Sequence, residues 1–138
     1  MHRRILDTNI YIDWLNAGAH QELIFEPGTV KLLSAVVMME LFAGADVRKD
    51  KMRLEDLANT FRKLSRIVTP SEQVYAEAGR VIQTLRTRLH FDIQRQRSIV
   101  NDILIALSAR SIGAEVVTQN QVDYLAIQKV IPFKLRIV

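Results

Sequence analysis

The sequence predicts an α/β fold, in which helices cover both faces of a parallel sheet. Short apolar segments alternate along the chain with segments of helical periodicity, and this alternation is typical of parallel sheets. The chain has 138 residues, of which 49% are hydrophobic and 25% charged, as in globular domains large enough to bury a core. No repeat, low-complexity tract or Gly/Ser linker divides it. We therefore expect a single domain over residues 1–138.

The first predicted strand ends on the carboxylate of Asp7. Residues 5–6 are apolar, and the apolar-periodic run that follows predicts a helix over residues 9–16. Ligands of open α/β sheets bind beyond the carboxyl ends of the strands, so Asp7 occupies a position typical of a functional group. A structural role is also open, because Asp7, Thr8 or Asn9 can cap the helix.

Four further segments have the composition of buried strands. Each is short, apolar and rich in β-branched residues, and the three prolines of the chain fall near the boundaries of these segments. The four predicted strands cover residues 29–33, 66–69, 115–118 and 133–138.

Other segments predict helices. The clearest begins at Ser71 and continues to residue 89, because apolar residues recur there at steps of three and four and define one buried face. Ser34 is a candidate N-cap for a helix that reaches Gly44, and Gly113 is a candidate C-cap for a helix that opens at Asn101. Two more helices are expected over residues 52–64 and 124–127, and charged or polar stretches occupy residues 46–53, 92–98 and 119–123.

The composition argues against several kinds of site. The chain contains no cysteine, which excludes disulfides, thiolate zinc sites and cysteine nucleophiles. His2, His20 and His90 are far apart and share no spacing typical of a metal site or a catalytic triad.

Hydropathy and charge bear on location and partners. No apolar run approaches the roughly 20 residues that span a bilayer, and the N-terminus leads into a strand pattern rather than a signal peptide. We therefore expect a cytoplasmic protein without a membrane partner. The formal net charge of +4 is compatible with a polyanionic partner, although the excess is small.

Three other carboxylates stand in apolar surroundings or at the start of a predicted element. Glu40 lies inside the apolar run 36–45, Asp102 opens a helix, and Asp123 follows the end of the fourth predicted strand. Each has a structural alternative: an exposed position for Glu40, an interaction with the helix dipole for Asp102, and a turn or cap for Asp123.

If these acids converge with Asp7, they cannot all stay ionised without a cation. Oxygen ligands without cysteine or clustered histidine select Mg²⁺ or Mn²⁺ over zinc. Such an ion lowers the pKa of an attacking water and neutralises charge on the leaving oxygen of a phosphodiester. The polar residues available to orient that water or a phosphate oxygen are Thr8, Asn9, Thr118 and Asn120. Asp13 is a weaker metal candidate, and a solvated position explains it better.

Four motifs in the chain, taken in order, resemble those of the PIN-domain ribonucleases, in particular the toxins of VapBC-type toxin–antitoxin pairs. Each contains one of the acids, and the motifs cover residues 6–12, 34–44, 101–106 and 118–124. The fourth is usually written Thr-x-Asn-x-x-Asp-Phe, and this chain has Tyr124 in place of the phenylalanine.

The resemblance implies a three-layer α/β/α sandwich with a mostly parallel central sheet. It also implies a Mg²⁺- or Mn²⁺-dependent endoribonuclease, the toxin of a type II toxin–antitoxin system, that cleaves RNA with a metal-activated water. Its catalytic and metal-binding residues would be Asp7, Glu40, Asp102 and Asp123. Its protein partners would be a cognate antitoxin, whose tail occupies the active-site groove, and a second copy in a homodimer.

Basic residues crowd the end of the long predicted helix and the segment after it: Arg80, Arg86, Arg88, Arg95 and Arg97. They are possible RNA contacts, because a cluster of carboxylates alone would repel RNA. Cations near a helix C-terminus are also favoured by the helix dipole without any ligand.

Two other functions are compatible with the sequence. One is a non-catalytic PIN-like domain that binds RNA or protein. The other is an aspartate-based phosphotransferase, which would need a second aspartate two residues after the first, where this chain has Asn9.

Overall fold

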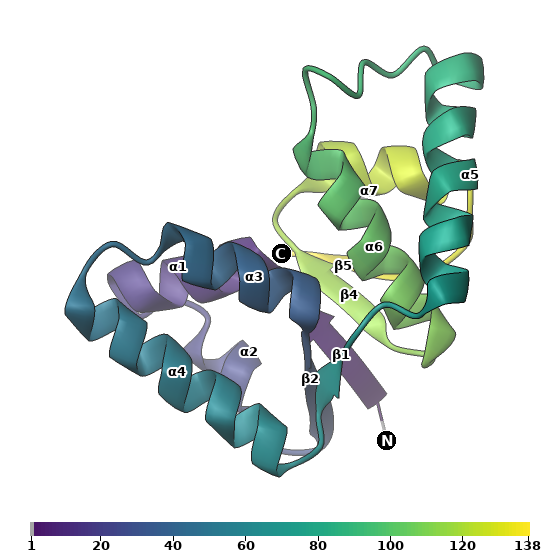
Figure 1. Ribbon diagram of the computed structural model, residues 1–138. Coiled ribbons are helices and arrows are strands. Elements are labelled where there is room, and N and C mark those ends of the chain that lie inside the picture. The colour runs from purple at the N-terminus through teal and green to yellow at the C-terminus, as the bar shows by residue number, and fades with distance from the viewer. Residues whose placement is uncertain (1) are drawn as a thin grey trace.

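The computed structural model describes residues 2–138 and contains, within them, five strands and seven helices (Figure 1). The strands are β1 (His2–Leu6), β2 (Thr29–Ser34), β3 (Ile67–Val68), β4 (Glu115–Thr118) and β5 (Lys134–Ile137). The helices are α1 (Thr8–Ala17), α2 (Gln21–Phe25), α3 (Ala35–Gly44), α4 (Arg48–Lys63), α5 (Glu72–Arg88), α6 (Ser98–Ser111) and α7 (Gln121–Gln128). Every predicted strand is present.

All five strands are parallel, and their order in the sheet is β3-β2-β1-β4-β5. The chain builds the sheet outward from β1 to β3, and then returns to the other side of β1 with β4 and β5. Leu6 on β1 is paired with Val117 on β4, so the two strands end side by side. The strand order reverses between them, which is where ligands bind in folds of this type.

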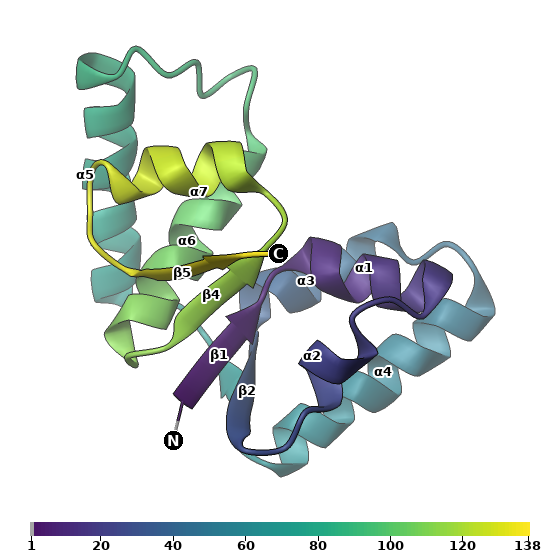
Figure 2. The same ribbon diagram turned by 180° about the vertical axis from the view of Figure 1, so that it is seen from behind.

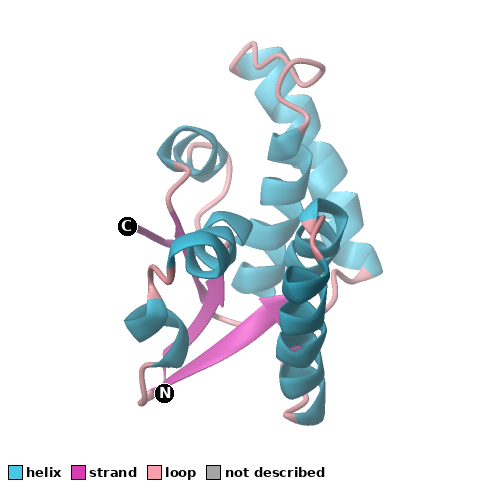
Figure 3. Cartoon of the chain, turned by 90° about the vertical axis from the view of Figure 1, so that its left-hand side faces the viewer, coloured by secondary structure: helices cyan, strands magenta, loops and turns pink. Residues whose placement is uncertain are grey.

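Helices cover both faces of this sheet. α3, α4, α5 and α6 lie on the face seen in Figure 1, whereas α1, α2 and α7 lie on the face seen in Figure 2. Figure 3 shows the strands between the two sets of helices. The three-layer α/β/α sandwich expected from the resemblance is therefore confirmed.

The core lies where the central strands meet α6. Ile5, Leu6, Val116 and Val117 are fully buried, as expected for parallel strands covered on both faces. α6 is buried continuously from Asp102 to Ala109, because α5, α7 and the sheet all pack against it. No helix in residues 2–138 is both long and apolar enough to cross a membrane.

Three helices begin three or four residues earlier than the sequence patterns predict. α4 begins at Arg48 rather than at residue 52. The apolar pattern does not reveal its first turn, because that turn is charged and brings no apolar residue to the core. α6 begins at Ser98, within the polar stretch. α7 begins at Gln121, because the Asn120 side chain caps it and accepts a hydrogen bond from the backbone N–H of Asp123. The prediction of a loop through residue 123 was therefore wrong.

Candidate active site

Asp7 lies at the end of β1, between that strand and α1. Its backbone N–H donates to the Val117 carbonyl oxygen at 2.8 Å, which extends the β1–β4 pairing to the acid. Its side chain is 4% exposed and accepts hydrogen bonds from the Thr8 backbone N–H at 2.8 Å and from the Thr118 hydroxyl at 2.7 Å. Asp7 is the N-cap of α1, so the expected structural role is present. Capping uses one carboxyl oxygen, Oδ1, and the second oxygen lies at the edge of the sheet.

Asn9 and Thr118 link the ends of β1 and β4. The Asn9 Nδ2 atom donates to Asp7 Oδ2 at 3.4 Å and to Thr118 Oγ1 at 3.3 Å. The Thr118 oxygen also accepts from the backbone N–H of Asn120 at 3.0 Å. The polar residues predicted to support the site therefore form one hydrogen-bonded network around Asp7.

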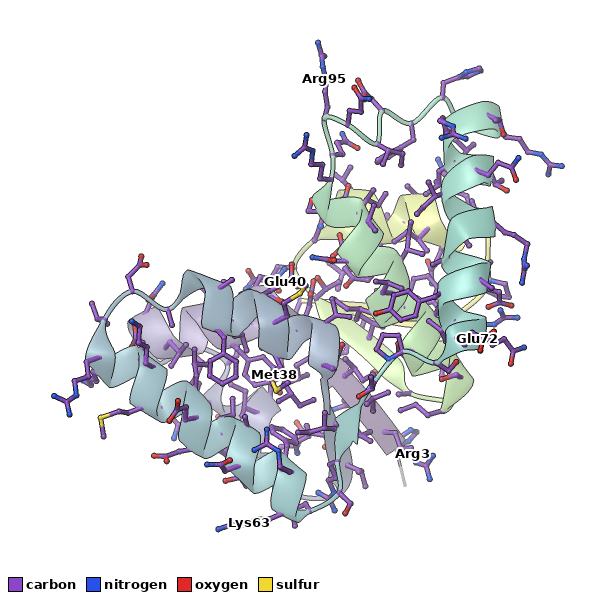
Figure 4. All side chains as sticks on the ribbon, viewed as in Figure 1. Arg3, Met38, Glu40, Lys63, Glu72 and Arg95 are labelled. Atoms are coloured by element: carbon purple, nitrogen blue, oxygen red, sulfur yellow. The ribbon has the colours of Figure 1, made fainter. Side chains whose placement is uncertain are left out.

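Glu40 reaches this network from α3. The Ser34 side chain caps that helix by accepting from the N–H groups of Val36 and Val37. Glu40 is half-buried; its Oε1 atom accepts from the Thr8 hydroxyl at 2.6 Å and its Oε2 atom from Asn101 Nδ2 at 3.4 Å. Figure 4 shows Glu40 where α3 approaches α6. The side chain therefore faces the site and is not a solvated residue on the polar side of its helix.

Asp102 and Asp123 lie on α6 and α7 and share one amide. The Asn120 Nδ2 atom donates to Asp102 Oδ2 at 3.2 Å and to Asp123 Oδ2 at 3.1 Å. Asp102 is 5% exposed and Asp123 is 9% exposed. Because α6 begins at Ser98, Asp102 lies in its second turn and not in its first, so stabilisation of the helix N-terminus does not explain this acid.

Hydrogen bonds through Thr8, Thr118 and Asn120 link all four acids, and their charges act on Asp102. Burial raises the pKa of Asp102 to about 8, with further contributions from the charges of Asp7, Asp123 and Glu40. Burial also raises the pKa of Asp7, and the hydrogen bonds from Thr118 and Thr8 oppose that shift. Of the ion pairs found in residues 2–138, none includes any of these four acids. The cluster thus has no internal cation to balance it.

The cluster fits a divalent ion in its donor chemistry. Its side chains supply carboxylate and hydroxyl oxygens, the ligands that Mg²⁺ and Mn²⁺ prefer. Within the described chain, however, no three His, Asp or Glu side chains are arranged so that they could hold an ion as they stand. Mg²⁺ commonly keeps several waters and binds through one or two carboxylates, so a closed set of protein ligands is not required. Metal binding by these acids stays a prediction.

None of the predicted RNA-contacting arginines forms an ion pair with the four acids within residues 2–138. Arg80, Arg86 and Arg88 are on exposed positions of α5, and Arg95 and Arg97 are exposed on the segment that joins α5 to α6. Figure 4 shows Arg95 extending from that segment, away from Glu40. All five side chains are exposed, and their contact with RNA stays a prediction.

Several residues around the acids were not identified from the sequence. Asn101, which contacts Glu40, gave no signal other than its place before Asp102. Gln119 contacts Asn9, and its side chain contacts Asp13, so Asp13 belongs to the rim of the site and is not shown among the central acids.

Tyr124 lies behind the acids and is fully buried, with its ring edge-to-face against Phe133 at a centroid distance of 6.3 Å. Its hydroxyl has no partner at hydrogen-bond distance in the described chain, and burial together with the nearby charges of Asp7 and Asp102 raises its pKa. The position that usually holds phenylalanine in the resembled motif therefore places a hydroxyl beneath the site.

Comparison with known proteins gives a consistent result. A family model described as "PIN domain" matches residues 4–126. The fold is similar to solved structures of DNA-bound VapBC from Salmonella typhimurium (TM-score 0.70, 23% identity, covering 99% of this chain and 98% of that chain) and of VapBC2 from Rickettsia felis bound to a promoter DNA fragment (0.67, 24%, 99% and 98%). It is also similar to FitAcB from Neisseria gonorrhoeae (0.67, 22%, 96% and 95%). A search of curated protein sequences gave no significant match.

Proposed function

The chain belongs to the PIN domain family, and from this membership we propose that it is a Mg²⁺- or Mn²⁺-dependent endoribonuclease that serves as the toxin of a type II toxin–antitoxin system. The observation that carries the proposal is the convergence of Asp7, Glu40, Asp102 and Asp123 at the point where the strand order reverses. Uncompensated buried carboxylates at this place in an α/β sheet are better explained by a cation-dependent site than by stability.

The residues of the chain have distinct parts in this activity. Asp7, Glu40, Asp102 and Asp123 would hold the ion. When bound, Mg²⁺ or Mn²⁺ makes an attacking water more acidic and stabilises charge on the phosphate and the leaving oxygen. Thr118 and Asn9 hold the Asp7 carboxylate, Thr8 holds Glu40, and Asn120 keeps Asp102 and Asp123 together.

Binding of RNA requires exposed positive charge, because the acid cluster alone would repel phosphates. The exposed arginines Arg80, Arg86, Arg88, Arg95 and Arg97 are suited to phosphate contacts, because cations that neutralise phosphates provide most of the sequence-independent affinity for nucleic acid. We expect RNA to extend from these residues towards the carboxylates.

A surface beside Glu40 supports an antitoxin partner. A groove there is lined by apolar side chains, including Ile12, Leu41 and Leu54, with Glu40 and Asp50 among its polar residues. It suits a peptide that offers apolar side chains together with a basic group. The fold is also similar to that of VapBC-5 from Mycobacterium tuberculosis (TM-score 0.61, 17% identity), a member of the VapBC family of toxin–antitoxin systems, and this supports the same kind of partner here.

We also propose a homodimer in the cytoplasm. A second groove, lined by Leu89, Phe91, Val122 and Leu125, exposes apolar area that a second copy could cover. Sedimentation or light scattering of the purified protein measures its oligomeric state directly.

The test of the proposed activity is the substitution Asp7→Asn. The wild-type protein, purified free of any partner, should cleave RNA in Mg²⁺ or Mn²⁺ and stop when EDTA is added. Asp7→Asn should lower the rate by at least about 100-fold, because the substitution removes a ligand charge, and should preserve the fold because the amide can still cap α1. Asp56→Asn, at an exposed position on α4, is the matched control. Full activity of Asp7→Asn would refute the assignment.

A non-catalytic PIN-like domain is the second candidate. The observation in its favour is that residues 2–138 contain no three His, Asp or Glu side chains already arranged around a metal position. If wild-type protein binds RNA but neither cleaves it nor binds Mn²⁺, this second function replaces the first.

A further inference from the structure

We propose that Gln119 is a positioning residue for Asp7: its side chain ties the β4–α7 connection to α1, and its backbone orients the Asn9 amide that contacts the acid. This inference rests on the proposed function, since it concerns the same site. Gln119 is exposed and lies outside the acid cluster.

The outer half of the connection is a three-residue cluster. The Gln119 Nε2 atom donates to Asp13 Oδ2 at 2.8 Å and lies 2.7 Å from His20 Nε2. With Gln119 as the donor, the Nε2 atom of His20 is the acceptor. Asp13 is on α1 and His20 directly precedes α2. The single amide of Gln119 therefore contacts two residues that are 106 and 99 positions before it in the sequence.

The inner half leads to Asp7. The backbone N–H of Gln119 donates to Asn9 Oδ1 at 3.3 Å. Because the carbonyl side of the Asn9 amide is engaged there, its Nδ2 side is directed to Asp7 Oδ2 at 3.4 Å and to Thr118 Oγ1 at 3.3 Å. The orientation of Asn9 therefore depends on where the Gln119 backbone lies, and the side chain of Gln119 fixes that place.

The conformation of His20 supports a specific role for this cluster. His20 has a φ of 60°, in the left-handed region that side chains other than glycine adopt infrequently. The turn returns the chain towards α1, and the imidazole comes within 3.6 Å of the Asp13 carboxylate. An unfavourable backbone conformation that brings a side chain to the rim of a site is consistent with a function there.

Stability alone does not explain the arrangement. Hydrogen bonds among exposed side chains contribute little to folding, because water replaces them readily. Gln128 offers a comparison, because it is half-buried. Its Nε2 atom donates to the Phe133 carbonyl oxygen at 3.0 Å and so holds the connection before β5. Loss of Gln128 should affect stability more than loss of Gln119, and should not affect the acids.

The experiment compares Gln119→Ala with Gln128→Ala in the full chain. Mn²⁺ binding is measured by calorimetry and by the EPR signal of the free ion, neither of which requires RNA cleavage. Gln119→Ala should raise the Kd for Mn²⁺ by about 10-fold, the low end of what loss of a residue that supports metal ligands causes, whereas Gln128→Ala should leave it unchanged. Asp13→Ala should have the effect of Gln119→Ala, and the double variant should be no worse than either single one.

A second readout examines the metal-free protein. The side-chain amide resonances of Asn9 should shift in Gln119→Ala and in Gln119→Met, which keeps the length of the side chain but has no donor, and should not shift in Gln128→Ala. If the wild type binds Mn²⁺ and the Gln119 variants bind it equally well, the inference is overturned. If the wild type binds no Mn²⁺, the proposed function fails, and the Asn9 resonances alone decide whether Gln119 positions this network.

Discussion

Asp102 is the carboxyl group whose pKa is raised by the charges of all three other acids of the site. Burial and the charges of Asp7, Asp123 and Glu40 raise its pKa to about 8, from a usual value of 3.8. Between about pH 4 and pH 8 the folded protein therefore holds a proton that the unfolded chain has released. The free energy of unfolding of the metal-free protein must then fall as the pH rises through this window.

The substitution Asp102→Asn tests this electrostatic conclusion. An amide cannot ionise, so the variant should lose much of the decline in stability between pH 4 and pH 8. At pH 8 in EDTA it should be more stable than the wild type by at least about 1 kcal/mol, since one unit of pKa shift corresponds to about 1.4 kcal/mol. Urea denaturation at several pH values measures the effect, with Asp56→Asn as the control at an exposed position. Equal slopes for wild type and Asp102→Asn would contradict the assigned pKa.

At the scale of elements, α3 depends on one buried cap. The Ser34 hydroxyl accepts from the N–H groups of Val36 at 3.1 Å and Val37 at 3.4 Å, and Ser34 is fully buried. Water cannot replace these hydrogen bonds, so their loss leaves unsatisfied donors inside the protein. The same helix holds Glu40 in the site.

We therefore expect Ser34→Ala to lower the free energy of unfolding by about 1 to 2 kcal/mol, in the range measured for helix caps. Ser71→Ala is the matched control, because Ser71 is exposed and caps α5 by accepting one hydrogen bond from the Val74 N–H. It should cost less, since Ser71 is exposed and only one N–H group loses its acceptor, against two at Ser34. Chemical denaturation of the two variants gives the comparison, and an equal or smaller cost at Ser34 would contradict it.

The elements that the sequence predicted best are those with a buried apolar face. α5 was predicted nearly in full because Val74, Ala78, Val81 and Leu85 pack against the core at helical spacing. The starts of α4, α6 and α7 were misplaced because polar residues form their first turns, and neither core packing nor periodicity marks such positions. Helix ends of this kind are set by local hydrogen bonds, such as the Asn120 cap.

The same distinction holds for the candidate site. The four acids could be predicted because a carboxylate next to an apolar run, or at the end of a strand, conflicts with its surroundings. Asp13 was considered only as a weaker metal candidate, and the parts of Gln119 and His20 could not be predicted, because they are polar residues in loop segments. Their contacts, such as the one between Gln119 and Asp13, join residues 106 positions apart and leave no periodic pattern in the sequence.

At the scale of the whole molecule, parallel topology assembles the site. β1 and β4 are neighbours although the Asp7 and Thr118 side chains that meet at their ends are 111 positions apart. α3, α6 and α7 then bring Glu40, Asp102 and Asp123 to the same edge of the sheet. The fold thus concentrates negative charge at one edge, although the chain has a formal net charge of +4.

The compensating positive charge is exposed on α5 and on the segment before α6, and this separation makes a quantitative prediction about RNA binding. Replacing Arg95 and Arg97 with alanine should weaken binding of single-stranded RNA and reduce the slope of log K against log salt concentration by about 1.4, at roughly 0.7 per lost phosphate contact. Fluorescence anisotropy with the Asp7→Asn protein measures binding without cleavage. Arg62→Ala with Lys63→Ala, in the exposed last turn of α4, removes the same charge elsewhere and should leave the slope unchanged. Equal slopes for the two double variants would mean that the RNA is held by net charge alone and not by the arginines between α5 and α6.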